Sequence, residues 1–286
     1  CVKRAFLYQG QRYQWQGKPR GTVVSEEPAE GFVFFLQNHD QIANQLWGDR
    51  LHQKVSPSVY RALTALLLLA PETPLLFMGQ EFAASSPFLF FTDFPPGQLA
   101  NDIHQGRKQF LSQFPSYASS AAQDAIGDPS APAMFERSKL DWTERERHAG
   151  IVALHRDLLR LRREDDVIAQ QRRDRVDGAV IGPSAFLLRY AGQHGDNRLL
   201  LVNLGPDLDF RPAPEPLLAP PSGRMWTFRW SSDAPSYGGP GVIEPLTETG
   251  WKIPGGAAFL YAALDDTSKD TGKTPAMASP HEEESR

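Results

Sequence analysis

The sequence predicts an α/β unit followed by an all-β domain, and three observations lead to this class. Two short apolar runs, residues 32–36 and 75–78, flank an apolar helical stretch that begins near Ser56. Each run ends in polar residues, and parallel sheets bind ligands at that end of their strands. After about residue 176 the pattern changes to short apolar runs separated by Gly, Pro, Asp and Asn, which is typical of an antiparallel β domain.

Composition excludes several classes of protein. The 286 residues carry 30 basic and 34 acidic side chains, a net charge of −4, so we expect no nucleic-acid partner. The single cysteine, Cys1, permits neither an intramolecular disulfide nor a cysteine cluster, and a reducing cytoplasm is the expected location. The longest apolar stretch, residues 62–70, is about half the ~20 residues that a membrane span needs, so no membrane partner is expected. Because the chain begins with Cys instead of Met, we expect a longer protein upstream.

The amino-terminal half reads as strand, helix, strand. Continuous hydrophobicity over residues 32–36 predicts a strand that is covered on both faces. The helix begins with Ser56 as N-cap and Pro57 at its first position, and Pro71 ends it. The second strand, residues 74–78, runs into Gly79-Gln80-Glu81. This order predicts a βαβ unit.

The rest of the chain divides into a loop, a helix and a set of strands. An aromatic and then polar stretch from residue 87 to about Pro132 is expected to be a long loop. A helix is expected to open at Thr143, with Glu146 completing a capping box. Further strands are predicted at residues 185–190, 199–204, 225–230 and 257–261, and residues 265–286 are expected to be disordered.

Asn38-His39-Asp40-Gln41 is the most informative tetrapeptide. Four polar side chains at the end of a buried strand cost free energy unless they meet a polar ligand or one another. A carboxylate beside an imidazole can hold two neighbouring hydroxyl groups, as sugars present them. The pattern leaves a second interpretation open, in which Asp40 caps the following turn and His39 bonds to the backbone.

Other polar and aromatic residues allow two interpretations each. Glu81 could contact sugar hydroxyls or pair with an arginine such as Arg50. The rings of residues 88–94 could form a stacking wall for glucose or pack as core beneath the loop, and Asp93 is the polar exception in that run. We assign no site to three tryptophans, which we expect in the core: Trp226, Trp230 and Trp251. Four histidines lack ligand-like spacing, so no metal is predicted: His104, His148, His155 and His194.

The segment 35–41 resembles the fourth signature region of the α-amylase superfamily, family 13 of the glycoside hydrolases. The whole set of motifs resembles the malto-oligosyltrehalose trehalohydrolase family within it, over roughly residues 1–262. The matching segments are Tyr8-Gln9-Gly10, Gln37-Asn38-His39-Asp40-Gln41, Gly48-Asp49-Arg50-Leu51, residues 75–81, residues 87–93 and Leu140-Asp141-Trp142. Two positions depart from the pattern, since Ala43 and Gln45 stand where the resemblance implies Gly and Arg.

The resemblance implies a fold and a role for the site residues. Residues 1–170 would be the carboxy-terminal part of a (β/α)8 TIM barrel containing its last two strands, 171–264 an antiparallel β-sandwich domain, and 265–286 a tail. Asp40 would be the carboxylate that stabilises the transition state. The implied substrate-binding residues are Asn38, His39, Gln41, Glu81 and Asp93. The nucleophile and the general acid would lie upstream, so this chain alone would be inactive.

The implied substrate is a maltooligosyl-trehalose, cleaved at the α-1,4 bond next to its trehalose end. This is a step of trehalose biosynthesis, and the resemblance implies no metal and no organic cofactor for it. Two alternatives remain open. One is another α-glucan-active member of the superfamily, such as a branching or debranching enzyme. The other is an inactive, glucan-binding remnant.

Overall fold

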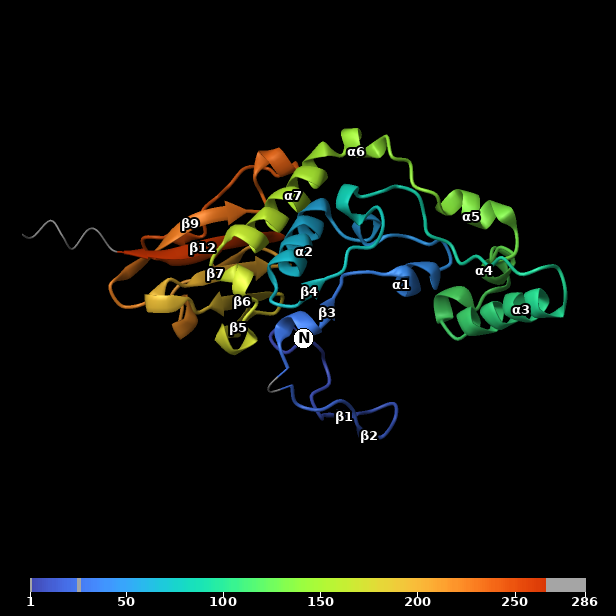
Figure 1. Ribbon diagram of the computed structural model, residues 1–286, viewed down its shortest axis with the longest axis horizontal. Helices are drawn as coiled ribbons and strands as arrows, with labels where there is room; N and C mark the ends of the chain where they lie inside the picture. The colour runs from blue at the N-terminus through green and yellow to red at the C-terminus, as the bar shows by residue number, and fades with distance from the viewer. Residues whose placement is uncertain (1, 25–26, 266–286) are drawn as a thin grey trace, which may run out of the picture.

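The structure is a computed structural model that describes residues 2–24 and 27–265. Its helices are α1 His39–Ala43, α2 Pro57–Leu69, α3 Gln98–Ser112, α4 Ser120–Asp124, α5 Pro132–Ser138, α6 Glu144–Arg147 and α7 Ala149–Glu164. Its strands are β1 Arg12–Tyr13, β2 Lys18–Pro19, β3 Val33–Phe34, β4 Thr73–Pro74, β5 Val176–Gly182, β6 Ala185–Tyr190, β7 Arg198–Asn203, β8 Leu208–Phe210, β9 Arg224–Ser231, β10 Leu246–Thr247, β11 Gly250–Ile253 and β12 Ala257–Asp265. The β-rich part lies at one end of the molecule and α3 to α5 at the other, with α2 and α7 nearer the β-rich part (Figure 1).

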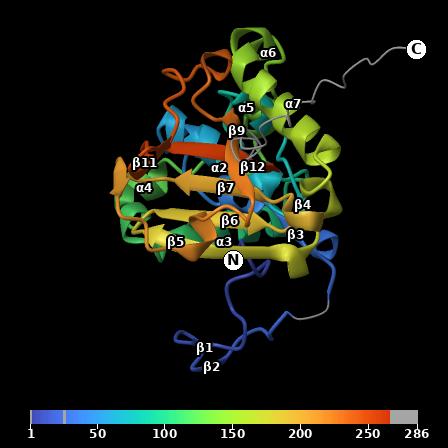
Figure 2. The same cartoon turned by 90° about the vertical axis from the view of Figure 1, so that its left-hand side faces the viewer.

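Two antiparallel sheets make up the carboxy-terminal part. The larger has the strand order β5-β6-β7-β12-β9, and the smaller has the order β10-β11-β8. One face of the larger sheet shares an apolar core with α2 and α7, and its other face shares a second core with the smaller sheet. Figure 2 shows the stacked strands of the larger sheet face on. The three strand tryptophans are buried in these cores, as predicted.

The four predicted strands of this part are confirmed: β6 has the predicted bounds, the ends of β7 and β9 shift by one residue, and β12 ends four residues later than predicted. The structure adds strands that were not predicted: β5, β8, β10 and β11. The last strand, β12, continues to Asp265, the first residue of the expected tail. Residues 266–286, on which the rest of that expectation falls, lie outside the described residues.

Helix α2 forms as predicted because its start and stop signals are local. The Ser56 hydroxyl accepts a hydrogen bond from the Val59 amide, Pro57 occupies the first position, and the helix ends before Pro71. Nine of its residues are buried, which fits a helix that is covered on most sides.

The prediction that residues 32–36 form a strand covered on both faces is wrong. Strand β3 spans two residues and pairs in parallel with β4, and the described residues place no third strand in this sheet. Phe34 packs against the core, whereas Val33 is 59% exposed. The second strand also begins and ends earlier than predicted, at Thr73 and Pro74. The βαβ order itself is confirmed.

The expected long loop, residues 87 to about 132, contains helices α3 and α4, and α5 begins at its end. Residues 98–138 form α3, α4 and α5. Helix α3 escaped prediction because it buries only Ala100 and Leu111, so its apolar pattern is sparse. Residues 87–97, which include the aromatic run, form no helix or strand.

The predicted capping box at Thr143 is also wrong. Thr143 makes no side-chain cap, and its amide and hydroxyl both donate to Asp141. The chain forms a short helix, α6, and then breaks at His148 before α7. Helix α7 buries Leu154 and Leu158.

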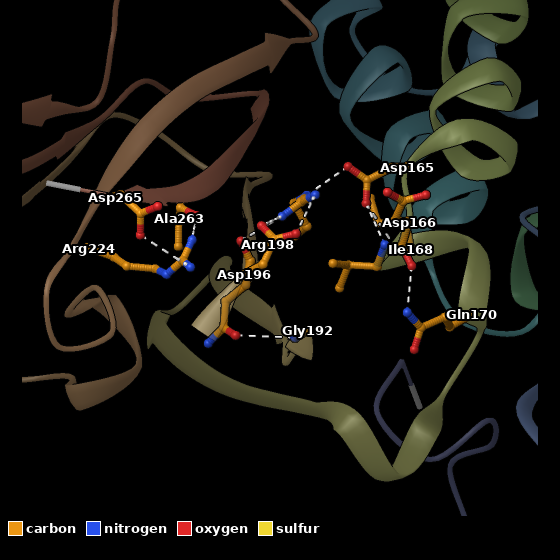
Figure 3. A network of polar contacts seen from close by, with 12 residues as sticks. Asp165, Asp166, Ile168, Gln170, Gly192, Asp196, Arg198, Arg224, Ala263 and Asp265 are labelled. Carbon is orange, nitrogen blue, oxygen red and sulfur yellow. Dashed lines mark hydrogen bonds and ion pairs between the residues drawn. The ribbon is translucent and has the colours of Figure 1, made fainter. Parts of the chain in front are cut away.

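Buried polar contacts join the helices to the larger sheet. Arg61 of α2 donates to the Ser232 carbonyl at 2.8 Å and pairs with Asp233 at 3.1 Å, and both side chains are at least nine-tenths buried. At the end of α7, Asp165 accepts from the Arg198 guanidinium of β7 at 2.7 Å (Figure 3). Asp165 also accepts from the Ile168 amide, so one carboxylate holds the turn after α7 and the sheet together.

Candidate active site

The turn after β3 is built by a capping box. Asn38 is the N-cap of α1, and its side-chain oxygen accepts from the Asp40 amide at 2.8 Å and the Gln41 amide at 3.4 Å. In return, the Gln41 side chain accepts from the Asn38 amide at 2.9 Å. Two of the four polar side chains therefore satisfy the helix end.

The other two side chains of the tetrapeptide are exposed at the surface, where they contact each other. The side chains of His39 and Asp40 are about two-thirds exposed, and His39 Nε2 lies 3.3 Å from Asp40 Oδ1. The interpretation in which Asp40 caps the turn is wrong, because Asn38 does so. Asp40 sits in the first turn of α1, where the helix dipole favours a carboxylate. An adjacent acceptor and donor of this kind can bind a pair of hydroxyl groups.

Arg50 ties the turn after β3 to the turn after β4. Its side chain is fully buried and donates to the Met78 carbonyl at 2.6 Å and the Ser86 carbonyl at 2.7 Å. Its guanidinium also lies 5.6 Å from the centroid of the Phe77 ring. Burial lowers the pKa of Arg50, and the nearby hydroxyl of Tyr60 and carboxylate of Glu81 oppose that effect.

Glu81 makes no direct pair with Arg50, one of the two alternatives that the sequence left open, because the Arg50 guanidinium donates to backbone carbonyls instead. It is half-buried in a 3-10 helix, η3 Gln80–Phe82, that follows Gly79. Gly79 has a φ of 81°, and a Cβ there would lie 2.7 Å from the Ala84 Cβ. Among the described residues no hydrogen bond joins Glu81 to Asp40.

The aromatic run divides between two sides of its loop. Phe88 and Phe91 line an open cavity of about 350 Å³. The other side chains around this cavity are Met78, Phe135, Ser138, Lys139, Leu140 and Trp142. Leu89 is buried, and Phe90 faces α3 instead. Asp93 is exposed, and in the described part of the chain it makes no direct contact with Asp40.

The structure adds residues that sequence reasoning missed. Arg107 of α3 donates to the Ala43 carbonyl, at the carboxyl end of the helix that carries Asp40. Glu144 of α6 is buried and accepts from the Ser85 amide at 2.9 Å and from its hydroxyl. Burial would raise the pKa of Glu144, but these hydrogen bonds outweigh it and lower the pKa. Both contacts join residues about 60 positions apart, so no local pattern signals them.

No group of three or more His, Cys, Asp or Glu side chains within 2–24 and 27–265 is arranged to hold a metal ion. No helix in the same ranges is both long and apolar enough to cross a membrane.

The fold and these motifs resemble those of the α-amylase family of glycoside hydrolases. A putative α-amylase from Salmonella typhimurium is 28% identical, with a TM-score of 0.72 over 92% of this chain and 40% of its own. A product complex of the multi-modular glycogen-degrading pneumococcal virulence factor SpuA has a TM-score of 0.51 at 16% identity, over 84% of this chain and 27% of its own. Residues 173–251 match a family described as "Domain of unknown function (DUF3459)".

Within that class the curated relatives are malto-oligosyltrehalose trehalohydrolases. The enzyme of Deinococcus radiodurans is 40% identical over 210 residues, which is 72% of this chain and 34% of the relative. That of Arthrobacter ramosus is 37% identical over 180 residues, 62% of this chain and 30% of the relative. The Mycobacterium tuberculosis enzyme is 32% identical over 235 residues, 81% of this chain and 37% of the relative. The chain thus spans about a third of their length, and the resemblance predicted from the motifs is confirmed.

Proposed function

We propose that the chain is the carboxy-terminal part of an enzyme that releases trehalose from maltooligosyl-trehalose by cleaving the adjacent α-1,4-glucosidic bond. The observation that carries this proposal is that two side chains of the tetrapeptide cap α1 and the other two are exposed. Asn38 and Gln41 cap α1, which leaves the Asp40 carboxylate and the His39 imidazole exposed side by side after β3. The similarity to trehalohydrolases over most of the chain supports the choice of substrate.

In this proposal β3 and β4 are the last two strands of a (β/α)8 barrel, and β5 to β12 form a β-sandwich behind it. The parallel pairing of β3 with β4 through α2 supports the first assignment. The two antiparallel sheets with a shared core support the second. Ligands of such barrels bind at the carboxyl ends of the strands, where Asp40 and Glu81 lie.

Asp40 is proposed to stabilise the positive charge that develops on the sugar in the transition state. A fixed carboxylate does this without reorganising, because Asn38 holds the backbone of Asp40 through its amide. His39 would bind the neighbouring hydroxyl. A retaining glycosidase also needs a nucleophile and an acid about 5 Å apart. We assign neither role to a residue of this chain, so the chain alone is proposed to be inactive.

The aromatic cavity beside β4 is proposed to bind a glucose ring of the maltooligosyl chain. Sugar rings carry C–H groups on their faces, which pack well on the apolar faces of aromatic side chains. Trp142 is 60% exposed and Phe135 is 48% exposed, so both present accessible ring surface. Asn38, Gln41, Glu81 and Asp93 stay proposed substrate-binding residues, the first two through their support of α1.

Product analysis tests the proposal. The full-length protein that carries this chain is expected to release trehalose from maltotriosyl-trehalose and to leave plain amylose largely intact. Hydrolysis or branching of amylose without trehalose release would favour another α-glucan-active enzyme. A folded full-length protein that acts on neither substrate would favour the inactive, glucan-binding alternative.

A further inference from the structure

Helix α1 is too short to hold its own conformation. It has five residues, and isolated helices of such length are unstable in water. Its amino end is held by the capping box of Asn38 and Gln41. Its carboxyl end exposes carbonyl groups that need donors from elsewhere. The Gln45 side chain supplies one, to the Gln41 carbonyl at 2.7 Å.

Arg107 of α3 supplies the other donors. One terminal nitrogen of its guanidinium donates to the Ala43 carbonyl at 2.5 Å and to the Gln45 carbonyl at 3.4 Å. The other terminal nitrogen donates to the Asn44 side-chain oxygen at 3.4 Å. A positive charge at this place also complements the negative end of the helix dipole.

The guanidinium of Arg107 also contacts the aromatic loop. It lies 4.5 Å from the centroid of the Phe90 ring, a distance typical of a cation–π contact. Phe90 follows Leu89, whose amide donates to the buried Ser138 hydroxyl of α5 at 3.0 Å. Burial lowers the pKa of Arg107, and an arginine nevertheless keeps its charge at neutral pH. The Arg107 guanidinium is therefore oriented toward α1 without any ligand.

We propose that Arg107 is a positioning residue for Asp40: it fixes the carboxyl end of α1 and so holds the Asp40 carboxylate in its working orientation. The catalytic consequence rests on the proposed function, whereas the structural part does not. Arg107 touches no reacting atom in this proposal. It acts only through the backbone of the helix that bears Asp40.

The structural part is tested in the full-length protein by hydrogen exchange of residues 39–46. Arg107→Gln is expected to speed exchange there about tenfold or more, since hydrogen bonds to charged groups are stronger than average. Exchange in α2 should stay unchanged. Arg107→Lys keeps the charge but loses the two terminal nitrogens of the guanidinium. Its exchange rate at residues 39–46 should lie between those of the wild type and Arg107→Gln. The matched control is Lys108→Gln, because Lys108 neighbours Arg107 on α3 and makes no hydrogen bond or ion pair within the described ranges.

Unchanged exchange in Arg107→Gln, or an equal effect of Lys108→Gln, would contradict the proposal. Global unfolding of both Arg107 variants would contradict it as well, because the arginine would then support the whole fold.

The catalytic part is tested by a double-mutant cycle in the full-length protein. Arg107→Gln is expected to lower kcat for trehalose release about tenfold with little change in KM. In an Asp40→Asn background the same substitution should change kcat less than about twofold, because its effect passes through Asp40. Equal losses in both backgrounds would overturn the positioning role. A wild-type protein that releases no trehalose would refute the proposed function and leave the exchange result standing.

Discussion

The side-chain oxygen of Asn38 accepts the backbone amide of Asp40 at 2.8 Å, so the residue that caps α1 also orients the residue proposed to act. Asn38→Ala should therefore loosen α1 with little effect on the rest of the fold. Loss of an N-cap costs about 1 kcal/mol, which corresponds to roughly fivefold faster exchange of the α1 amides. Hydrogen exchange measures this, and Ser119→Ala is the matched control because Ser119 caps the distant helix α4. Equal protection of α1 in Asn38→Ala and the wild type would refute this prediction.

The buried pair of Arg61 and Asp233 should dominate the attachment of α2 to the larger sheet. Removing one partner of a buried ion pair leaves an uncompensated charge and costs about 3 kcal/mol or more. Asp233→Ala is expected to lower the free energy of unfolding by about that amount in urea titrations. Glu136→Ala, which breaks the exposed pair with Lys139, should cause no measurable change. Comparable losses in the two variants would mean that burial of the first pair is unimportant.

His52 should make the fold less stable in mild acid. Burial, with help from the charge of Arg50, lowers the pKa of His52 from 6.5 to about 4. Between these values the unfolded chain binds a proton that the folded chain does not, so the free energy of unfolding decreases as the pH falls through this window. Because the ring is only half-buried, we expect a loss of about 1 to 2 kcal/mol instead of the full shift.

Urea titrations from pH 7 to pH 4 check this dependence. His52→Gln should reduce the pH dependence of the free energy of unfolding. His155→Gln should reduce it further, because burial also lowers the pKa of His155. The same pH dependence in His52→Gln and the wild type would contradict the assignment.

Trp142 should contribute to glucan binding by the full-length protein. Aromatic stacking is worth about 0.5–1.5 kcal/mol, so Trp142→Ala is expected to raise KM for maltotriosyl-trehalose about two- to tenfold and to leave kcat nearly unchanged. Trp47→Ala is the matched control, because Trp47 is also more than half exposed and lines a different, smaller cavity. An unchanged KM in Trp142→Ala would rule out the aromatic cavity as a sugar subsite.

Local signals predicted the parts of the fold that depend on neighbours in the sequence. Helix α2 carries its own cap at Ser56 and its own stop at Pro71. Strands β6, β7, β9 and β12 pair antiparallel in one sheet, and they are rich in buried apolar side chains. The position of the tetrapeptide after β3 could also be predicted, because polar residues follow a continuous apolar run.

The errors arose where distant residues decide the outcome. Continuous apolar sequence at residues 32–36 predicted a covered strand, but the described residues supply a neighbour on one edge only, and Val33 is left exposed. Thr143 was expected to cap a helix, yet its amide and its hydroxyl donate to the Asp141 carboxylate. The contact of Arg107 with α1 spans 64 positions and has no counterpart in local pattern or propensity.

The most direct test of the account is trehalose release by the full-length protein with Asp40→Asn. The amide has the shape of the carboxylate and lacks its charge, so α1 and its capping box should stay intact. We expect kcat to fall about 10²- to 10³-fold in Asp40→Asn. Asp93→Asn removes a second carboxylate and should act mainly on KM. Strong trehalose release by the wild type that survives in Asp40→Asn would contradict the role of this carboxylate.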